Sequence, residues 1–328
     1  MTRQTQARNA LVTGAAGFVG SFLSERLVQE GWTVRGVDCF TDYYDPDLKR
    51  RHLGTLSSSP RFSLEHLDLR TADLAPLLRG VDVVWHLAAQ AGVRRSWGQM
   101  FESYTSINVL ATQRILEAAL QAEVGRVVYA SSSSVYGEAP EFPASEDGPT
   151  NPISPYGVTK LAGEHLSRLY HRAYGLPTVS LRYFTVYGPR QRPDMAFHKF
   201  FRALHEGSPI TIHGDGEQTR DFTYIDDVTE ANFRAGRLGE AGGVYNINGG
   251  SRASVLEVIS IMERAMERAA IKEFGPTQKG DPLHTGGDPR RARQDLQFQP
   301  EVDLETGLHR MARWMNDFLE GRPEAAHS

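Results

Sequence analysis

The sequence contains one cysteine, Cys39, among 328 residues. A single cysteine cannot form a disulfide within the chain or a cysteine-based metal site, so disulfide scaffolds and zinc ribbons are excluded. Because such chains suit a reducing compartment, we expect a cytoplasmic protein, and we expect no bound metal.

The sequence also lacks a long apolar run and an excess of charge of one sign. No segment approaches the roughly 20 apolar residues that a membrane-spanning helix needs, so no association with a membrane is expected. The 36 basic and 40 acidic residues leave a net charge of −4. This balance provides no positive field for nucleic acid, and local arginines must therefore meet any anionic ligand.

Apolar residues make up 40% of the chain, enough for a buried core, and their pattern is ordered. Short β-rich segments alternate with amphipathic segments, which predicts an α/β fold with a doubly wound parallel Rossmann sheet. The predicted strands are 10–13, 33–37, 61–66, 81–87, 126–131 and 178–183, and the predicted helices are 18–30, 71–78, 99–122 and 155–174.

The alternation ends near residue 186, where proline and glycine become more frequent. We therefore expect a Rossmann domain over residues 1–185, with later segments near 219–247 returning to it. Residues 186–328 are expected to form a smaller mixed α/β lobe with helices at 195–205, 226–237 and 254–268.

A Gly-rich turn separates the first predicted strand from the first predicted helix. Its glycines are Gly14, Gly17 and Gly20. They suit, in this order, a tight turn, the close approach of a phosphate and the contact of helix with strand. Phe18 and Val19 begin the helix, where backbone N–H groups can bind a pyrophosphate. The turn predicts a dinucleotide site, and an ordinary structural turn is the alternative.

An acidic residue, Asp38, follows the second predicted strand. This is close to the position at which an acid binds the ribose hydroxyls of a bound dinucleotide. Because a carboxylate there repels a 2′-phosphate, Asp38 favours NAD over NADP, although a plain aspartate at a strand end is also possible. The ends of the next two strands contribute further expected cofactor contacts: Asp68, Leu69, Leu87, Ala88 and Ala89.

Tyr156 and Lys160 lie four residues apart on a predicted helix, and hence on one face of it. A nearby ammonium favours the phenolate, which can then act as a general base, and Lys160 can also bind the cofactor. Ser132, at the end of the fifth strand, is expected to orient the substrate oxygen. A Tyr-x-x-x-Lys pair alone is common on helices, but the Gly-rich turn and the serine run favour a catalytic role.

Together these motifs resemble the extended short-chain dehydrogenase/reductase superfamily, and within it the NAD-dependent nucleotide-sugar epimerases and dehydratases. The resemblance covers nearly the whole chain and is carried by residues 13–20, 86–89, 132–137, 154–160, 182–190 and 219–222. It implies that residues 1–185 bind NAD and residues 186–328 bind a UDP-sugar. It also implies a homodimer formed through helices 99–122 and 155–174. His86 and Asn108 look structural.

Two departures from the family pattern narrow the activity. Family dehydratases carry an acidic pair directly after the catalytic hydroxyl residue, where this chain has Ser133 and Ser134. Family decarboxylases of UDP-glucuronate usually carry a glutamate at the second of these positions. The resemblance therefore implies an epimerase or a simple oxidoreductase.

Two further segments are similar to UDP-glucuronate 4-epimerases: residues 42–50, which include Tyr43 and Tyr44, and residues 188–195. In that group the residue matching Arg192 is implied to hold the sugar carboxylate, and a guanidinium suits a planar carboxylate. Arg220 and Asp281 match positions that hold the diphosphate and the uridine ribose. The full set of implied substrate residues is Arg94, Ser133, Ser134, Thr185, Arg192, Arg220 and Asp281.

The expected function is NAD-dependent 4-epimerisation of a UDP-sugar, UDP-glucuronate to UDP-galacturonate, through a transient 4-keto intermediate. UDP-glucose 4-epimerase is the nearest alternative. Two further alternatives are a UDP-glucuronate decarboxylase and a non-catalytic NAD-binding regulator.

Overall fold

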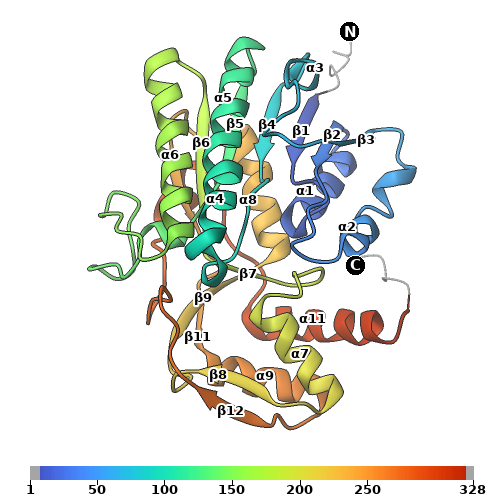
Figure 1. Ribbon diagram of the computed structural model, residues 1–328, viewed down its shortest axis with the longest axis vertical. Coiled ribbons are helices and arrows are strands. Elements are labelled where there is room, and N and C mark those ends of the chain that lie inside the picture. The colour runs from blue at the N-terminus through green and yellow to red at the C-terminus, as the bar shows by residue number, and fades with distance from the viewer. Residues whose placement is uncertain (1–7, 323–328) are drawn as a thin grey trace.

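A parallel sheet of seven strands forms the centre of the computed structural model, which describes residues 8–322 (Figure 1). Its strand order is β10-β6-β5-β4-β1-β2-β3. The strands are β1 (Asn9–Thr13), β2 (Thr33–Asp38), β3 (Phe62–His66), β4 (Val83–His86), β5 (Arg126–Ser132), β6 (Thr178–Tyr183) and β10 (Val244–Ile247). All six predicted strands are present, and the doubly wound parallel sheet is confirmed.

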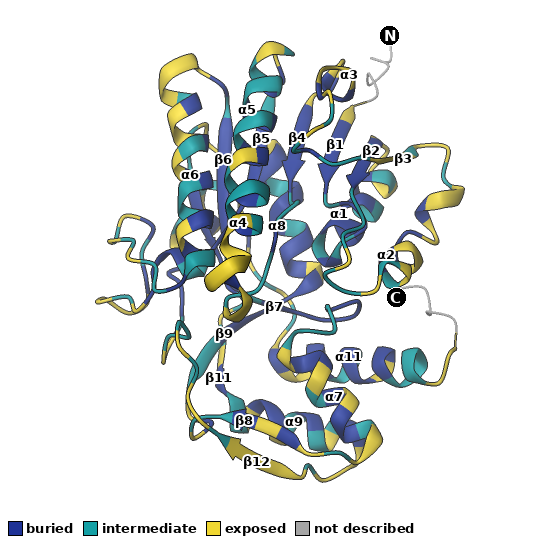
Figure 2. Cartoon of the chain, in the orientation of Figure 1, coloured by how far each residue is buried: buried dark blue, intermediate teal, exposed yellow. Residues whose placement is uncertain are grey.

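Helices cover both faces of this sheet, which is why its strands are largely buried, except for the edge strand β3 (Figure 2). Along β1, Leu11 packs into one apolar cluster and Val12 into another, because successive strand side chains point to opposite faces. One cluster lies against α1 (Phe18–Gln29) and α8 (Ile225–Leu238), and the other against α5 (Ala111–Gln121) and α6 (Pro155–Tyr174).

The helix bounds agree with the predictions except in two segments. In the segment predicted as a helix over 71–78, only α3 (Ala75–Leu78) is helical, because Pro76 lacks an N–H group and fits only the first turn. The segment predicted over 99–122 consists of four pieces: η3 (Gly98–Met100), α4 (Phe101–Thr105), the π-helical η4 (Ser106–Leu110) and α5. Helix α6 begins as predicted, with the Ser154 hydroxyl accepting from the Gly157 N–H at 3.1 Å.

The remaining elements form a smaller lobe beside the large sheet (Figure 1). Three strands, β7 (Thr185–Tyr187), β9 (Thr219–Tyr224) and β11 (Ser251–Ser254), make one small sheet. Strands β8 (Ile210–His213) and β12 (Lys272–Gly275) make another. Helices α7 (Ala196–Glu206) and α9 (Val255–Met266) match predicted segments, and the Ser254 capping box of α9 is present.

Three further helices were not predicted: α2 (Pro46–His52), α10 (Arg290–Asp295) and α11 (Leu304–Leu319). Within residues 8–322, no helix is long and apolar enough to cross a bilayer. The first seven and last six residues of the two predicted domains lie outside the described residues.

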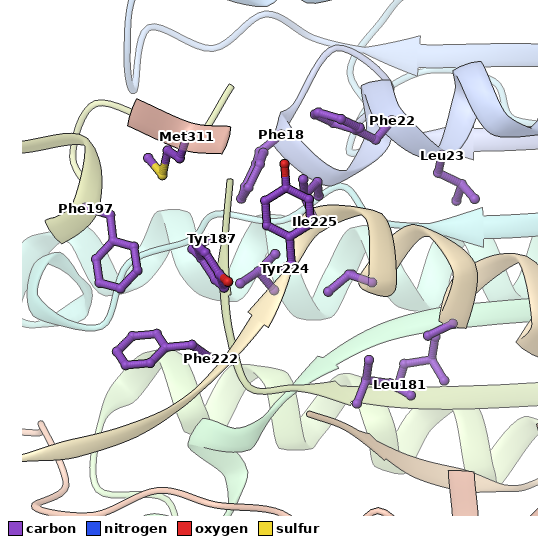
Figure 3. Close-up of a cluster of buried hydrophobic side chains, with 14 of the residues drawn as sticks. Phe18, Phe22, Leu23, Leu181, Tyr187, Phe197, Phe222, Tyr224, Ile225 and Met311 are labelled. Carbon is purple, nitrogen blue, oxygen red and sulfur yellow. The ribbon is translucent and has the colours of Figure 1, made fainter. Parts of the chain in front are cut away.

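An aromatic cluster joins the large sheet to the smaller lobe (Figure 3). Tyr187 of β7 contacts Phe197 of α7, with ring centroids 5.5 Å apart, and Phe197 lies 4.9 Å from Phe222 of β9. The same apolar cluster includes Phe18 and Phe22 of α1. Because one core runs through both parts, the walls of the space between them are held in a defined arrangement.

Candidate functional site

A cavity of about 1080 Å³ opens between the carboxyl end of the large sheet and the smaller lobe. This is where parallel α/β sheets bind ligands. All predicted site residues except Arg220 line it. The predicted cofactor residues in its wall are Gly14, Gly17, Phe18, Val19, Gly20, Asp38, Asp68, Leu69, Leu87, Ala88, Ala89, Tyr156 and Lys160.

The Gly-rich turn is shaped by close backbone contacts. Gly14 has φ +71°, and a Cβ at Gly20 would lie 2.0 Å from the Gly14 carbonyl oxygen. A Cβ at Gly17 would meet only that oxygen, at 3.1 Å, and would otherwise occupy the cavity. No side chain caps the N-terminus of α1, so its first N–H groups are available to an anion. The turn therefore fits the pyrophosphate of a dinucleotide.

Asp38 is held in place at the end of β2. Its carboxylate accepts from the Ala16 N–H at 3.2 Å and the Phe40 N–H at 2.8 Å, and the ammonium of Lys49 lies 3.8 Å away. Arg35 donates instead to the carbonyl oxygens of residues 76 and 77, so its guanidinium faces away from Asp38. A carboxylate without that arginine suits a ribose with free hydroxyls, as in NAD.

Two polar residues described as structural from sequence support the cavity wall. His86 is buried, with Nδ1 2.8 Å from the Thr13 hydroxyl, and burial and the charge of Lys160 lower its pKa to about 3. The imidazole is therefore neutral. Asn108 exchanges hydrogen bonds with the backbone of Gln90 at 2.7 and 3.0 Å. Both residues fix the backbone that faces the cavity.

The predicted catalytic residues Ser132, Tyr156 and Lys160 line the same cavity. Burial raises the pKa of Tyr156, while a hydrogen bond with Ser132 and the charge of Arg192 lower it. Burial lowers the pKa of Lys160 to about 7, and its ammonium lies 4.9 Å from the ring centre of Tyr129. The Ser132 hydroxyl also accepts from the Ser134 N–H at 3.2 Å. A phenol, a hydroxyl and an amine are thus arranged for proton transfer.

A buried ion pair lies beside Ser131, and no sequence motif predicted it. Arg182 of β6 pairs with Glu164 of α6 through two contacts, at 2.6 and 3.0 Å, with side chains 3% and 0% exposed. The Ser131 hydroxyl donates to the same carboxylate at 2.8 Å. This pair ties the end of β5 to the helix that carries Tyr156.

Among the predicted substrate residues, two arginines are paired with acids. Arg192 contacts Asp194 at 2.9 and 3.0 Å, and Arg94 contacts Asp281 at 2.9 and 3.2 Å. Arg220 lies outside the cavity wall and donates to the carbonyl oxygens of Thr219 and Leu283. Ser133, Ser134 and Thr185 line the cavity near the catalytic residues.

Other residues of the cavity wall were not assigned a role from sequence. They come from the β2–α2 loop, α2, the β7–α7 loop, α7 and β8, and include Tyr43, Tyr44, Lys49, Asp194, Lys199, Phe200, Ile210 and His213. The β8 residues carry no motif, and only the tertiary structure brings them to the cavity.

The comparison with protein families agrees with this geometry. A model of the NAD dependent epimerase/dehydratase family matches residues 10–248. The chain is similar to an uncharacterized UDP-glucose epimerase, YtcB, of Bacillus subtilis, with 45% identity over 95% of this chain and 99% of that protein. It is also similar to a UDP-glucuronate 4-epimerase of Thermodesulfobacterium geofontis, with 38% identity over 94% of this chain and 97% of that protein.

Among solved structures, a similar one is the UDP-glucuronic acid 4-epimerase of Bacillus cereus in complex with UDP-glucuronic acid and NAD. It is 43% identical, has a TM-score of 0.92, and the match covers 94% of this chain and 99% of that chain. The family match spans the Gly-rich turn, the serine run and the Tyr156–Lys160 pair. This chain belongs to the NAD dependent epimerase/dehydratase family.

Proposed function

We propose that this protein is an NAD-dependent 4-epimerase of UDP-sugars that interconverts UDP-glucuronate and UDP-galacturonate. The observation that carries the proposal is one cavity that joins the Gly-rich turn to Ser132, Tyr156 and Lys160, with Arg192 in the same wall. The relatives named as UDP-glucuronate 4-epimerases support the choice of sugar.

The residues present fit NAD. Gly14, Gly17 and Gly20 leave room for the pyrophosphate beside the uncapped start of α1, and Asp38 presents its carboxylate to the ribose hydroxyls. When bound, NAD would supply the acceptor for a hydride from C4 of the sugar and the donor for its return to the other face of the same carbon.

The chain's own residues move the proton that this oxidation requires. Tyr156 takes the proton of the sugar 4-hydroxyl, and the Ser132 hydroxyl orients that oxygen. The charge of Arg192, and that of Lys160 when it is protonated, favour the phenolate. After the 4-keto sugar turns about its link to the diphosphate, Tyr156 returns the proton to O4. No net redox change results.

The substrate side of the cavity must hold a sugar that carries a carboxylate. Arg192 offers a planar fork of donors to that carboxylate, and Ser133, Ser134 and Thr185 supply hydroxyls nearby. We assign Arg94, Arg220 and Asp281 to the UDP portion. The place of Arg94 and Asp281 in the cavity wall supports this assignment. Arg220 lies on β9, outside the wall, and donates to the Leu283 carbonyl oxygen.

UDP-glucose 4-epimerase is the second candidate, favoured by the name of the B. subtilis relative. The first experiment incubates the purified protein, without added NAD, with UDP-glucuronate and separately with UDP-glucose, and identifies the sugars by NMR. UDP-galacturonate from the first substrate alone supports the uronate epimerase. Formation of UDP-galactose from UDP-glucose would favour the second candidate. A UDP-pentose product would indicate a decarboxylase, and no turnover of either sugar would indicate a non-catalytic regulator.

Arg192→Met distinguishes the two epimerase activities. Removing a charge-assisted hydrogen bond costs roughly 1.5–3 kcal/mol, so kcat/KM for UDP-glucuronate should fall by about 10- to 200-fold, with UDP-glucose little affected. Unchanged turnover of UDP-glucuronate by Arg192→Met would contradict the assignment of Arg192 to the sugar carboxylate.

Three further features complete the proposal. We infer an NAD-binding domain over residues 1–185 with segments near 219–247 returning to it, supported by β10 in the large sheet, and a sugar-binding lobe over residues 186–328. We infer a homodimer through α4, η4, α5 and α6, whose surfaces expose Phe101, Leu110 and Leu169. A cytoplasmic location agrees with the single cysteine.

A further inference from the structure

We propose that Asp194 and Tyr43 are positioning residues that fix the guanidinium of Arg192, and that this contact keeps the reaction intermediate from losing its carboxylate. The inference rests on the proposed function, because it requires a uronate substrate. It assigns a role to Tyr43, which takes no part in the proton transfer.

The geometry of Arg192 shows which of its edges is already used. Its Nε lies 2.9 Å from one oxygen of Asp194 and its Nη2 lies 3.0 Å from the other, with the side chains 19% and 22% exposed. This pairing uses the side edge of the guanidinium. Of its five N–H donors, those on the end edge remain for a second carboxylate. Asp194 therefore decides which edge faces the sugar.

Tyr43 holds this ion pair from a distant part of the chain. Its hydroxyl donates to Asp194 at 3.3 Å, and its ring centre lies 5.9 Å from the guanidinium carbon of Arg192 and 5.2 Å from that of Arg95. A Cβ at Gly92 would come within 2.5 Å of the Tyr43 hydroxyl, so a glycine is needed beside it. The β2–α2 loop and the β7–α7 loop are thereby joined across the cavity.

Electrostatics keep the pair ionised. Burial would raise the pKa of Asp194, but the charge and hydrogen bonds of Arg192 hold it below its usual value. Burial and the charge of Asp194 raise the pKa of Tyr43, so the phenol keeps its proton and remains a donor. Arg192, Asp194 and Tyr43 can thus act as one unit at neutral pH.

The chemistry of the intermediate explains why this orientation matters. A 4-keto uronate is a β-keto acid. When its C5–C6 bond lies in line with the carbonyl π system, that bond breaks, its electron pair forms an enolate at C4–C5, CO2 leaves, and C5 then takes a proton. Reduction at C4 by the hydride already removed yields a UDP-pentose. A carboxylate held in one orientation out of line avoids this loss.

Two variants test the proposal, with UDP-glucuronate as substrate and product ratios read by NMR. Asp194→Asn keeps the shape of the Asp194 side chain but removes its ion pair with Arg192. Misplacement of reacting groups changes reaction rates by up to about 100-fold. We expect the ratio of UDP-pentose to UDP-galacturonate to rise by about ten-fold or more. Tyr43→Phe removes one hydrogen bond, worth about 1 kcal/mol, and should raise the ratio by about five-fold.

The matched control is Asp47→Asn, which breaks an aspartate–arginine pair, with Arg50 at 2.6 Å, that lies exposed on α2. Its product ratio should equal that of the wild type. Affinity for UDP, measured by titration calorimetry, should be unchanged in all three variants, because the fold and the nucleotide pocket are retained.

Two outcomes overturn the proposal. An unchanged product ratio in both Asp194→Asn and Tyr43→Phe would show that neither residue controls the carboxylate. An equal fall of both products at a constant ratio would indicate a merely structural role. A wild-type protein that does not epimerise UDP-glucuronate would instead remove the proposed function, and this result appears before any variant is made.

Discussion

The two sides of the cavity are built from different kinds of contact. On the cofactor side, the Gly14–Gly20 turn is built from close backbone contacts beside the neutral His86, and charge enters through the Asp38–Lys49 pair at 3.8 Å. On the substrate side, loops carry ion pairs such as Arg192–Asp194 and Arg94–Asp281. The first kind of site depends on close packing and the second on charge. Changes on the cofactor side should therefore affect folding and NAD retention, and changes on the substrate side should affect specificity.

Tyr156→Phe tests the point where the two sides meet. Loss of a general base lowers rates by about 100- to 10,000-fold, so kcat should fall by that factor. Neither the Gly-rich turn nor the ion pairs change, so NAD content of the purified protein and its affinity for UDP should match the wild type. Residual activity above about a tenth of the wild type would contradict the assignment of Tyr156.

Glu164→Ala breaks the buried pair with Arg182 and leaves an uncompensated charge in the large domain. The free energy of unfolding, measured in urea, should fall by about 3–5 kcal/mol. The control is Glu30→Ala, which removes a partly exposed pair with Arg26 and should cost less than about 1 kcal/mol. Equal losses in the two variants would mean that burial of the pair is unimportant.

Gly20→Ala tests the close packing of the cofactor side. The added methyl group would lie 2.0 Å from the Gly14 carbonyl oxygen, so stability should fall by about 1–3 kcal/mol and bound NAD should be lost. In the control Gly275→Ala, the nearest atom to the new Cβ is 3.7 Å away, which is an ordinary contact. If Gly20→Ala retained NAD as the control does, the turn would not form the cofactor site.

The neutral state of His86 predicts a specific pH dependence. Its pKa is lowered from 6.5 to about 3, so the unfolded chain takes up a proton first as pH falls. The stability contributed by neutral His86 is present above pH 6.5 and is lost as pH falls towards about 3, by up to about 1.4 kcal/mol per pH unit. Urea unfolding of His86→Gln should show a shallower dependence over this window. Parallel curves for the two proteins would contradict the prediction.

Arg94→Met is expected to have the smallest effect. Arg94 is 50% exposed and Asp281 30%, and exposed ion pairs contribute about 0–1 kcal/mol to stability. The unfolding midpoint should stay near that of the wild type, while affinity for UDP should weaken by about two- to five-fold because a cation is lost. A loss of several kcal/mol in stability would show that the substrate side supports the fold as the cofactor side does.

The cofactor side could be predicted because its signals are local. Gly14, Gly17 and Gly20 lie between one strand and one helix, so their places in space follow from their order in the chain. Tyr156 and Lys160 share a helix face for the same reason. These residues therefore needed no knowledge of distant contacts.

The smaller lobe was predicted less completely, for two different reasons. Helix α11 carries a local signal that was overlooked: Asp303 caps it, and its buried residues include Leu304, Leu308, Met311 and Met315, at helical spacing. The strands β8 and β12 have four residues each and pair only with each other. Segments this short carry too little pattern to distinguish a strand from a loop.

The sequence by itself determined the parallel sheet, the position of the Gly-rich turn and the shared face of Tyr156 and Lys160, because helix and strand periodicity act over short distances. Only the tertiary structure decided that Tyr43 meets Asp194, 151 residues away, and that Arg94 meets Asp281, 187 residues away. Which charged side chains form a pair depends on how close they lie in space. That distance depends on how the two lobes pack around their common core.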